Sequence, residues 1–100
     1  MPHVIRLRGP WSWERNGDCD KGTRRFGRPT LPEGERVWLV IESAWAIEEV
    51  RLNDAPLAGD LSQRGWRCDV TTSLAWRNEL SLRLASAPAD TNVEVRLEID

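Results

Sequence analysis

The residue types that carry out enzyme chemistry occur in this chain, but not in a usable arrangement. Its one histidine, His3, stands near the start, where a Ser–His or Cys–His nucleophilic pair would depend on a commonly mobile end of a chain. Glu33 and Glu35 belong to a turn-rich loop, and the adjacent Glu48 and Glu49 would point to opposite faces of a strand. Sugar hydrolysis by two carboxylates needs both to face one cleft. We therefore expect no enzyme activity and no cofactor.

One stretch is similar to the start of a calcium-binding loop. Asn16, Asp18 and Asp20 place oxygen ligands at alternate positions, as such a loop does. However, the glycine comes one position late, at Gly22, Lys21 lies inside the loop, and no glutamate follows at the loop's last ligand position. We predict an ordinary polar loop without metal, with calcium at Asn16, Asp18 and Asp20 as the weak alternative.

The charge balance argues against a nucleic-acid partner. The chain of 100 residues has 14 lysines and arginines against 16 aspartates and glutamates, a net charge of -2. Nucleic-acid binding needs concentrated positive charge to displace counterions. The basic run Arg24-Arg25-Phe26 with Arg28 would be divided between the two faces of a strand, so it forms no single basic patch.

The sequence also indicates the cellular compartment. No run approaches the ~20 apolar residues of a membrane span, and the start shows no basic region followed by an apolar stretch, as a secretory signal would. The two cysteines, Cys19 and Cys68, form no Cys-x-x-Cys pair. We expect a cytoplasmic protein with two reduced thiols and no contact with a membrane.

The elements that must position any site are strands. Apolar residues recur with a period of two, which is typical of half-buried strands, and no helical period extends over ~11 residues. Turn residues such as Gly9-Pro10 and Asn53-Asp54 separate these runs. We predict a single domain over residues 1–100, folded as an antiparallel sandwich. The expected strands cover residues 3–8, 23–27, 37–42, 47–52, 66–70, 80–84 and 93–99.

The inward positions of these strands define the expected core. They are apolar and alternate with polar or charged neighbours, and Val40 makes its strand apolar on both faces, which favours a central place in a sheet. The predicted core consists of Phe26, Val37, Leu39, Ile41, Val50, Leu52, Val70, Leu80, Leu82, Val95 and Leu97.

Several motifs in a fixed order resemble a known domain. They are Arg25-Phe26 with Pro29, Val37-Trp38-Leu39, Leu52-Asn53-Asp54, Trp66-x-x-Asp69-Val70-Thr71 and Asn78-x-Leu80. Together they resemble the galactose-binding-like jelly-roll domain of glycoside hydrolase family 2 and other β-galactosidases. The sequence departs from that pattern at Asp54 and Arg77, where glycine is usual. The resemblance implies that Asn53 sets a turn and that Asp69 bonds to the backbone after its strand.

The resemblance also implies a function. In that family the domain folds beside a catalytic barrel and performs no chemistry, and the catalytic glutamates lie in the barrel, so no catalytic residue can be assigned here. The leading hypothesis is a non-catalytic accessory or binding module with carbohydrate as its ligand. The alternative is a protein–protein interaction or scaffolding domain, or a homo-oligomer, that binds no sugar.

Tryptophan provides the candidate ligand residues, because an indole face stacks on a sugar ring and also anchors protein interfaces. The chain has 6 tryptophans and no tyrosine. We expect Trp38 and Trp66 to pack in strands, whereas the places of Trp11 and Trp13 stay open. The predicted ligand site consists of Trp45 and Trp76, near strand ends or in loops, with Ser43 and Asn78 as hydrogen-bonding partners.

Overall fold

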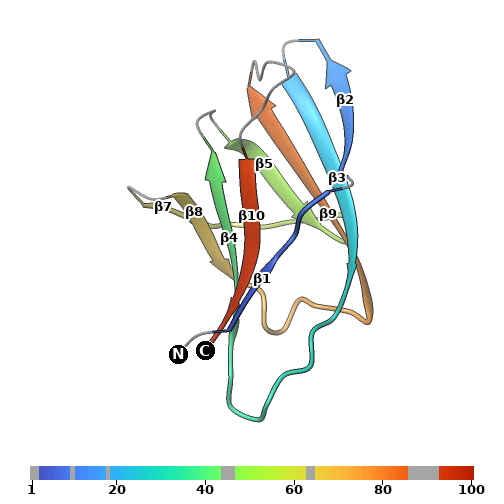
Figure 1. Cartoon of the computed structure of the whole chain (residues 1–100). Helices are drawn as coiled ribbons and strands as arrows, with labels where there is room; N and C mark the ends of the chain where they lie inside the picture. The colour runs from blue at the N-terminus through green and yellow to red at the C-terminus, as the bar shows by residue number, and fades with distance from the viewer. Residues whose placement is uncertain (1–2, 10, 18, 44–46, 63–64, 86–92) are drawn as a thin grey trace.

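The computed structural model describes residues 3–9, 11–17, 19–43, 47–62, 65–85 and 93–100. In this part the chain forms two antiparallel five-stranded sheets that pack face to face as a β-sandwich (Figure 1). This confirms the all-β sandwich predicted from the period of two. The described residues include no helix, and so none that is long and apolar enough to cross a membrane.

The first sheet joins strands from both ends of the chain. Its β4 lies in the middle, as the apolar residues on both faces of that strand predicted. In spatial order the sheet consists of β1 (His3–Arg6), β10 (Val93–Ile99), β4 (Val37–Ser43), β8 (Gly65–Asp69) and β7 (Asp60–Ser62).

The second sheet carries the candidate site. Its central strand, β9 (Arg77–Ala85), pairs with β3 (Cys19–Gly27) on one side and β5 (Ile47–Leu52) on the other. In spatial order the sheet consists of β2 (Ser12–Asn16), β3 (Cys19–Gly27), β9 (Arg77–Ala85), β5 (Ile47–Leu52) and β6 (Ala55–Pro56).

The main error in the sequence prediction concerns β2 and β3. We expected a polar loop from residue 16 and a short strand from residue 23, but β3 begins at Cys19 and β2 had not been predicted. Asn16 pairs with Cys19 across a tight hairpin, in which Gly17 adopts a φ of 62° that glycine reaches without strain. The strand pairing along this hairpin outweighs its polar composition. Similarly, β6 and β7 occupy segments in which no strand was expected.

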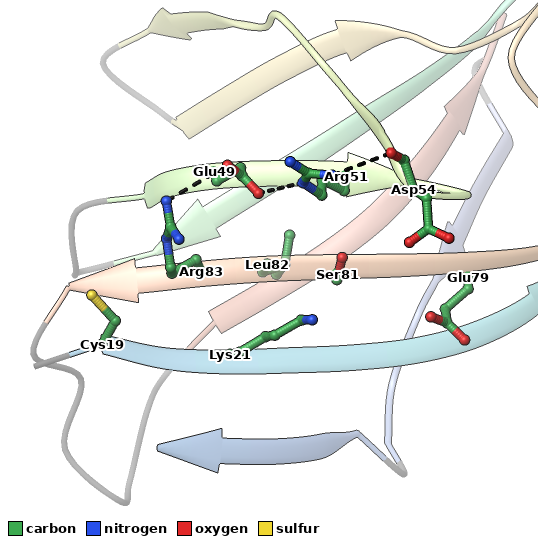
Figure 2. A pocket seen from close by; sticks show the side chains of 9 residues that line it. All are labelled: Cys19, Lys21, Glu49, Arg51, Asp54, Glu79, Ser81, Leu82 and Arg83. Carbon is green, nitrogen blue, oxygen red and sulfur yellow. Dashed lines mark hydrogen bonds and ion pairs between the residues drawn. The ribbon is translucent and has the colours of Figure 1, made fainter. Parts of the chain in front are cut away.

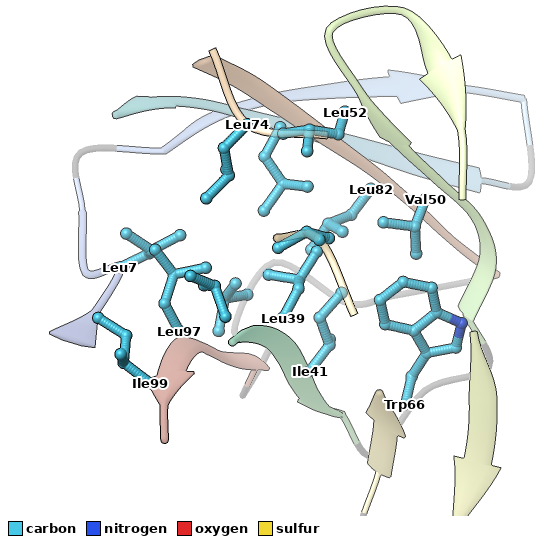
Figure 3. Close-up of a cluster of buried hydrophobic side chains, with 14 residues drawn as sticks. Leu7, Leu39, Ile41, Val50, Leu52, Trp66, Leu74, Leu82, Leu97 and Ile99 are labelled. Carbon is cyan, nitrogen blue, oxygen red and sulfur yellow. The ribbon is translucent and has the colours of Figure 1, made fainter. Parts of the chain in front are cut away.

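The core lies between the sheets (Figure 3). Every predicted core residue is buried except Phe26, which is half-buried and packs against the cluster. Trp66 is buried as expected, with 6% exposure. Trp38 is half-buried on the outer face of β4, where the Arg67 guanidinium lies 4.1 Å from its ring centre. Trp38 therefore packs through a cation–π contact and not within the core.

Two predicted turn residues act as the sequence indicated. Asn53 and Asp54 connect β5 to β6 with φ values of 53° and 66°, the pattern of a two-residue type I′ turn. After β8, a carboxylate oxygen of Asp69 accepts hydrogen bonds from the Thr71 N–H at 3.0 Å and the Thr71 hydroxyl at 2.6 Å. The Thr71 Oγ1 in turn accepts the Val37 N–H at 2.9 Å, so this turn is bonded to the first residue of β4.

Leu82→Ala tests the core assignment, because Leu82 is fully buried in β9. We expect the free energy of unfolding in urea to fall by ~2–4 kcal/mol, since the truncation leaves a cavity among packed side chains. The neighbouring Ser81→Ala, on the outer face of the same strand, is the matched control and should change it by less than ~0.5 kcal/mol. Equal effects of the two variants would contradict the assignment of faces.

Asp69 should make stability sensitive to acid. The hydrogen bonds from Thr71, and then the charge of Arg36, hold the pKa of its carboxyl below the ordinary value. A depressed native pKa stabilises the fold above the unfolded-state pKa of about 3.9, and this contribution is lost as the pH falls through the native value. Asp69→Asn should therefore flatten the decline in unfolding free energy below about pH 4. A decline parallel to that of the wild type would contradict this role.

Candidate functional site

The structure separates the four predicted ligand residues. Trp45 lies outside the described residues. Ser43 is the half-buried last residue of β4, in the first sheet, and pairs with Val93. Trp76 and Asn78 flank the start of β9 in the second sheet, and β9 begins at the end of the sandwich opposite to the one where β4 ends (Figure 1). Ser43 is therefore not a partner of Trp76.

Trp76 is 85% exposed, although its backbone is held on both sides. The Arg28 N–H donates to the Trp76 carbonyl at 3.0 Å. The preceding residue, Ala75, donates its N–H to Asn78 Oδ1 at 2.8 Å and accepts from Asn78 Nδ2 at 2.9 Å. The sequence placed Trp76 in a loop, and the structure adds that this loop is anchored while the indole remains in solvent.

Asn78 is a structural residue and not a ligand residue. It is 3% exposed and is the buried polar residue of the described chain. Its Oδ1 also accepts a hydrogen bond from Asn53 Nδ2 at 3.0 Å. Both the oxygen and the nitrogen of the Asn78 side-chain amide therefore form hydrogen bonds within the protein. The predicted hydrogen bonds from Asn78 to a ligand would require breaking these contacts, and we therefore leave Asn78 out of the site.

Asn53 connects the β5–β6 turn to the start of β9. Its Oδ1 accepts the Glu79 N–H at 2.8 Å, and its own N–H donates to the Glu79 carbonyl at 2.9 Å. The turn residue predicted from the sequence thus docks against β9 and helps to bury Asn78. No sequence signal had linked these two asparagines, which are 25 residues apart.

A hollow of about 600 Å³, here called the Gly27 hollow, lies at the start of β9, and Arg77, the residue after Trp76, is one of its lining residues. Gly27 lies opposite Arg77 on the paired strand and Arg25 lies opposite Glu79, so the position of Gly27 contributes no side chain to this part of the sheet. A Cβ added at Gly27 would meet only the Trp76 carbonyl oxygen within 4 Å, at 3.9 Å. The hollow is lined by Arg25, Phe26, Gly27, Asn53, Arg77, Asn78 and Glu79.

A second hollow of about 350 Å³, here called the ion-pair hollow, lies further along the second sheet (Figure 2). The register between β5 and β9 shifts between Ile47 and Glu49, as in a β-bulge. Glu48 and Glu49 both lie near Arg83, at 3.4 and 3.5 Å. The prediction that adjacent glutamates would face opposite sides is therefore wrong here, because the bulge breaks the alternation.

The glutamates of the ion-pair hollow are bonded to arginines, which disfavours a role as general acid. Arg51 donates a hydrogen bond to Glu49, and this bond, followed by the charges of Arg51 and Arg83, lowers the pKa of Glu49. A carboxyl whose pKa is lowered stays ionised at neutral pH and cannot serve as a general acid. Its cations and carboxylates largely neutralise one another (Figure 2).

The other candidates for reactive chemistry show ordinary structural roles. Cys19 and Cys68 lie in different sheets and form no disulfide, and burial raises the pKa of the Cys68 thiol, which disfavours the reactive thiolate. Asp20 pairs with Arg15 within the β2–β3 ladder, whereas Asp18 lies outside the described residues. No group of three His, Cys, Asp or Glu side chains in the described chain is arranged to hold a metal ion.

Comparison with known proteins gives a structural match but no sequence match. No protein-family model and no curated protein matches the chain. Among solved structures, it is similar to the FMN-binding β-glucuronidase from Facaelibacterium prausnitzii L2-6, with a TM-score of 0.73 and 20% sequence identity. The match covers 99% of this chain and 22% of that chain. At this identity the likeness establishes the fold alone, a β-domain of the kind found within a glycoside hydrolase.

Asn78→Ala tests the anchoring of Trp76. Removing the amide leaves Ala75 without its two hydrogen bonds, and we expect a loss of about 1–3 kcal/mol in unfolding free energy. The Trp76 indole N–H signal in NMR spectra should also broaden or shift, because the backbone beside it loses its anchor. Thr72→Ala, at an exposed position of the same turn, is the control. An unchanged Trp76 signal in a folded Asn78→Ala protein would contradict the anchoring role.

Proposed function

We propose that this chain is a non-catalytic accessory module of a carbohydrate-active protein, with the galactose-binding-like jelly-roll fold, and that it binds a saccharide at Trp76. Two observations support the proposal. The motifs resemble the domain of glycoside hydrolase family 2, and the whole chain matches a part of a β-glucuronidase that is too small to contain a complete catalytic unit. In this proposal the chain hydrolyses nothing itself.

The observation that carries the binding role is the exposure of an anchored tryptophan. The Trp76 indole is 85% exposed, and the backbone beside it is held by hydrogen bonds to Asn78 and Arg28, so a large flat aromatic face is presented to ligands. A flat indole desolvates the apolar face of a pyranose, and the fixed backbone of Trp76 limits the entropy lost on binding.

The second candidate is a protein-interaction module, and the outer face of the first sheet favours it. There Val4 of β1 is an exposed apolar residue, with 42% exposure. Trp38 lies under Arg67 on this face, and Trp and Arg are the residue types enriched at the centres of interfaces. A stable dimer by mass, with no sugar binding, would move the assignment to this second function.

Trp76→Ala should abolish sugar binding without unfolding the domain. We expect the unmodified chain to bind simple glycosides weakly, in the millimolar to high-micromolar range, or roughly -4 to -6 kcal/mol. NMR amide shifts during a titration provide the measurement, and Trp76→Phe should retain part of the affinity because a smaller ring still stacks. Val4→Ala, at an exposed apolar residue of the other sheet, is the matched control. Equal affinities of Trp76→Ala and Val4→Ala would disprove the site.

A further inference from the structure

Arginines gather around the exposed tryptophan at the start of β9. Arg77 follows Trp76 directly, and the backbone of Arg28 is bonded to the Trp76 carbonyl. Arg25 lines the Gly27 hollow together with Arg77. The chain as a whole carries a net charge of -2, so three arginines at one end of one sheet form a local excess of positive charge.

This positive charge is only partly neutralised within the protein. Glu79 is the one carboxylate that lines the Gly27 hollow, and it is already paired with Arg25 at 3.2 Å. Arg77 and Arg28 are exposed and form no ion pair with any residue in the described ranges. The Gly27 hollow differs in this respect from the ion-pair hollow, where glutamates bond Arg51 and Arg83.

We propose that the ligand of this surface is an anionic saccharide, whose pyranose ring stacks on Trp76 while a carboxylate on the ring binds Arg77 in the Gly27 hollow. The inference rests on the proposed saccharide-binding function and names the chemical class of its ligand. A planar guanidinium donates two parallel N–H hydrogen bonds to a carboxylate, a geometry that suits a ring substituent. Arg28, which directly follows Gly27 and whose backbone is bonded to Trp76, adds a further positive charge to this end of the sheet, and Gly27 leaves space for the carboxylate.

A single-stranded nucleic acid also combines negative charge with stacking, but the surface fits it less well. Such ligands are held by extended basic grooves with several stacking aromatics. Here one tryptophan and three arginines occupy one end of the second sheet, and Arg83 and Arg51, further along it, are paired with glutamates. The charge of Arg51 and Arg83 is thus already neutralised, so the positive surface does not continue along β5 and β9 as a basic groove.

The test compares neutral sugars with sugars that differ only by a carboxylate. Methyl glycosides of glucose, galactose and mannose are titrated beside the corresponding 6-carboxylates, and affinities are taken from NMR amide shifts. We expect the carboxylates to bind about 3- to 10-fold more tightly, with a preference that falls as salt is added. Arg77→Gln should remove this preference by weakening the binding of the carboxylates, because the charge that distinguishes them from neutral sugars is then lost.

Two further variants separate charge from space. Arg15→Gln removes an exposed arginine from β2, at the edge of the same sheet, and should leave the preference intact. Gly27→Leu fills the hollow without changing charge and should also remove the preference. Arg77→Gln changes the charge of the Gly27 hollow, whereas Gly27→Leu changes its space. If one of these two variants fails to fold, the other remains a valid test.

The outcomes distinguish this inference from the function on which it rests. Equal binding of neutral and carboxylated sugars at Trp76 would overturn the inference and leave the proposed function in place. Binding of neither class would overturn both. A short oligothymidylate that binds more tightly than every carboxylated sugar, and loses its binding in Trp76→Ala, would replace the anionic saccharide with a nucleic acid.

Discussion

The position of Trp76 depends on one buried amide. Asn78 is the polar side chain enclosed by the described part of the sandwich, and its three hydrogen bonds join the turn before β9 to the β5–β6 turn. A buried amide without partners would be costly, so this arrangement is stable only when both turns are in place. The backbone beside the exposed indole is thus held by part-buried hydrogen bonds.

Much of the fold follows from patterns that act locally. Alternation in Val37–Ile41 and Leu80–Leu84 identifies buried faces, and Asn53-Asp54 identifies a tight turn, because each pattern depends on neighbouring residues alone. The same reasoning failed for β2 and β3, whose polar residues form strands because they pair with one another and with β9. It also failed at Glu48, where a bulge displaced the register, which depends on the partner strand.

The site was only partly predictable for the same reason. The loop position of Trp76 could be predicted, because it precedes a recognisable strand in the sequence. The structural role of Asn78 could not, because it depends on Asn53 in a different hairpin and on Ala75 in the preceding turn. Nor could the Gly27 hollow, whose formation requires β3 to pair with β9 so that Gly27 lies opposite Arg77.

The central claim is that a saccharide ring lies against the Trp76 indole. Intermolecular NOEs between a bound methyl 6-carboxylate glycoside and the selectively labelled tryptophan rings test it most directly. The account predicts NOEs from the axial protons of the sugar to the Trp76 ring, together with amide shifts at Gly27 and Arg77. NOEs to another tryptophan, such as the exposed Trp13, with no contact at Trp76 would contradict it.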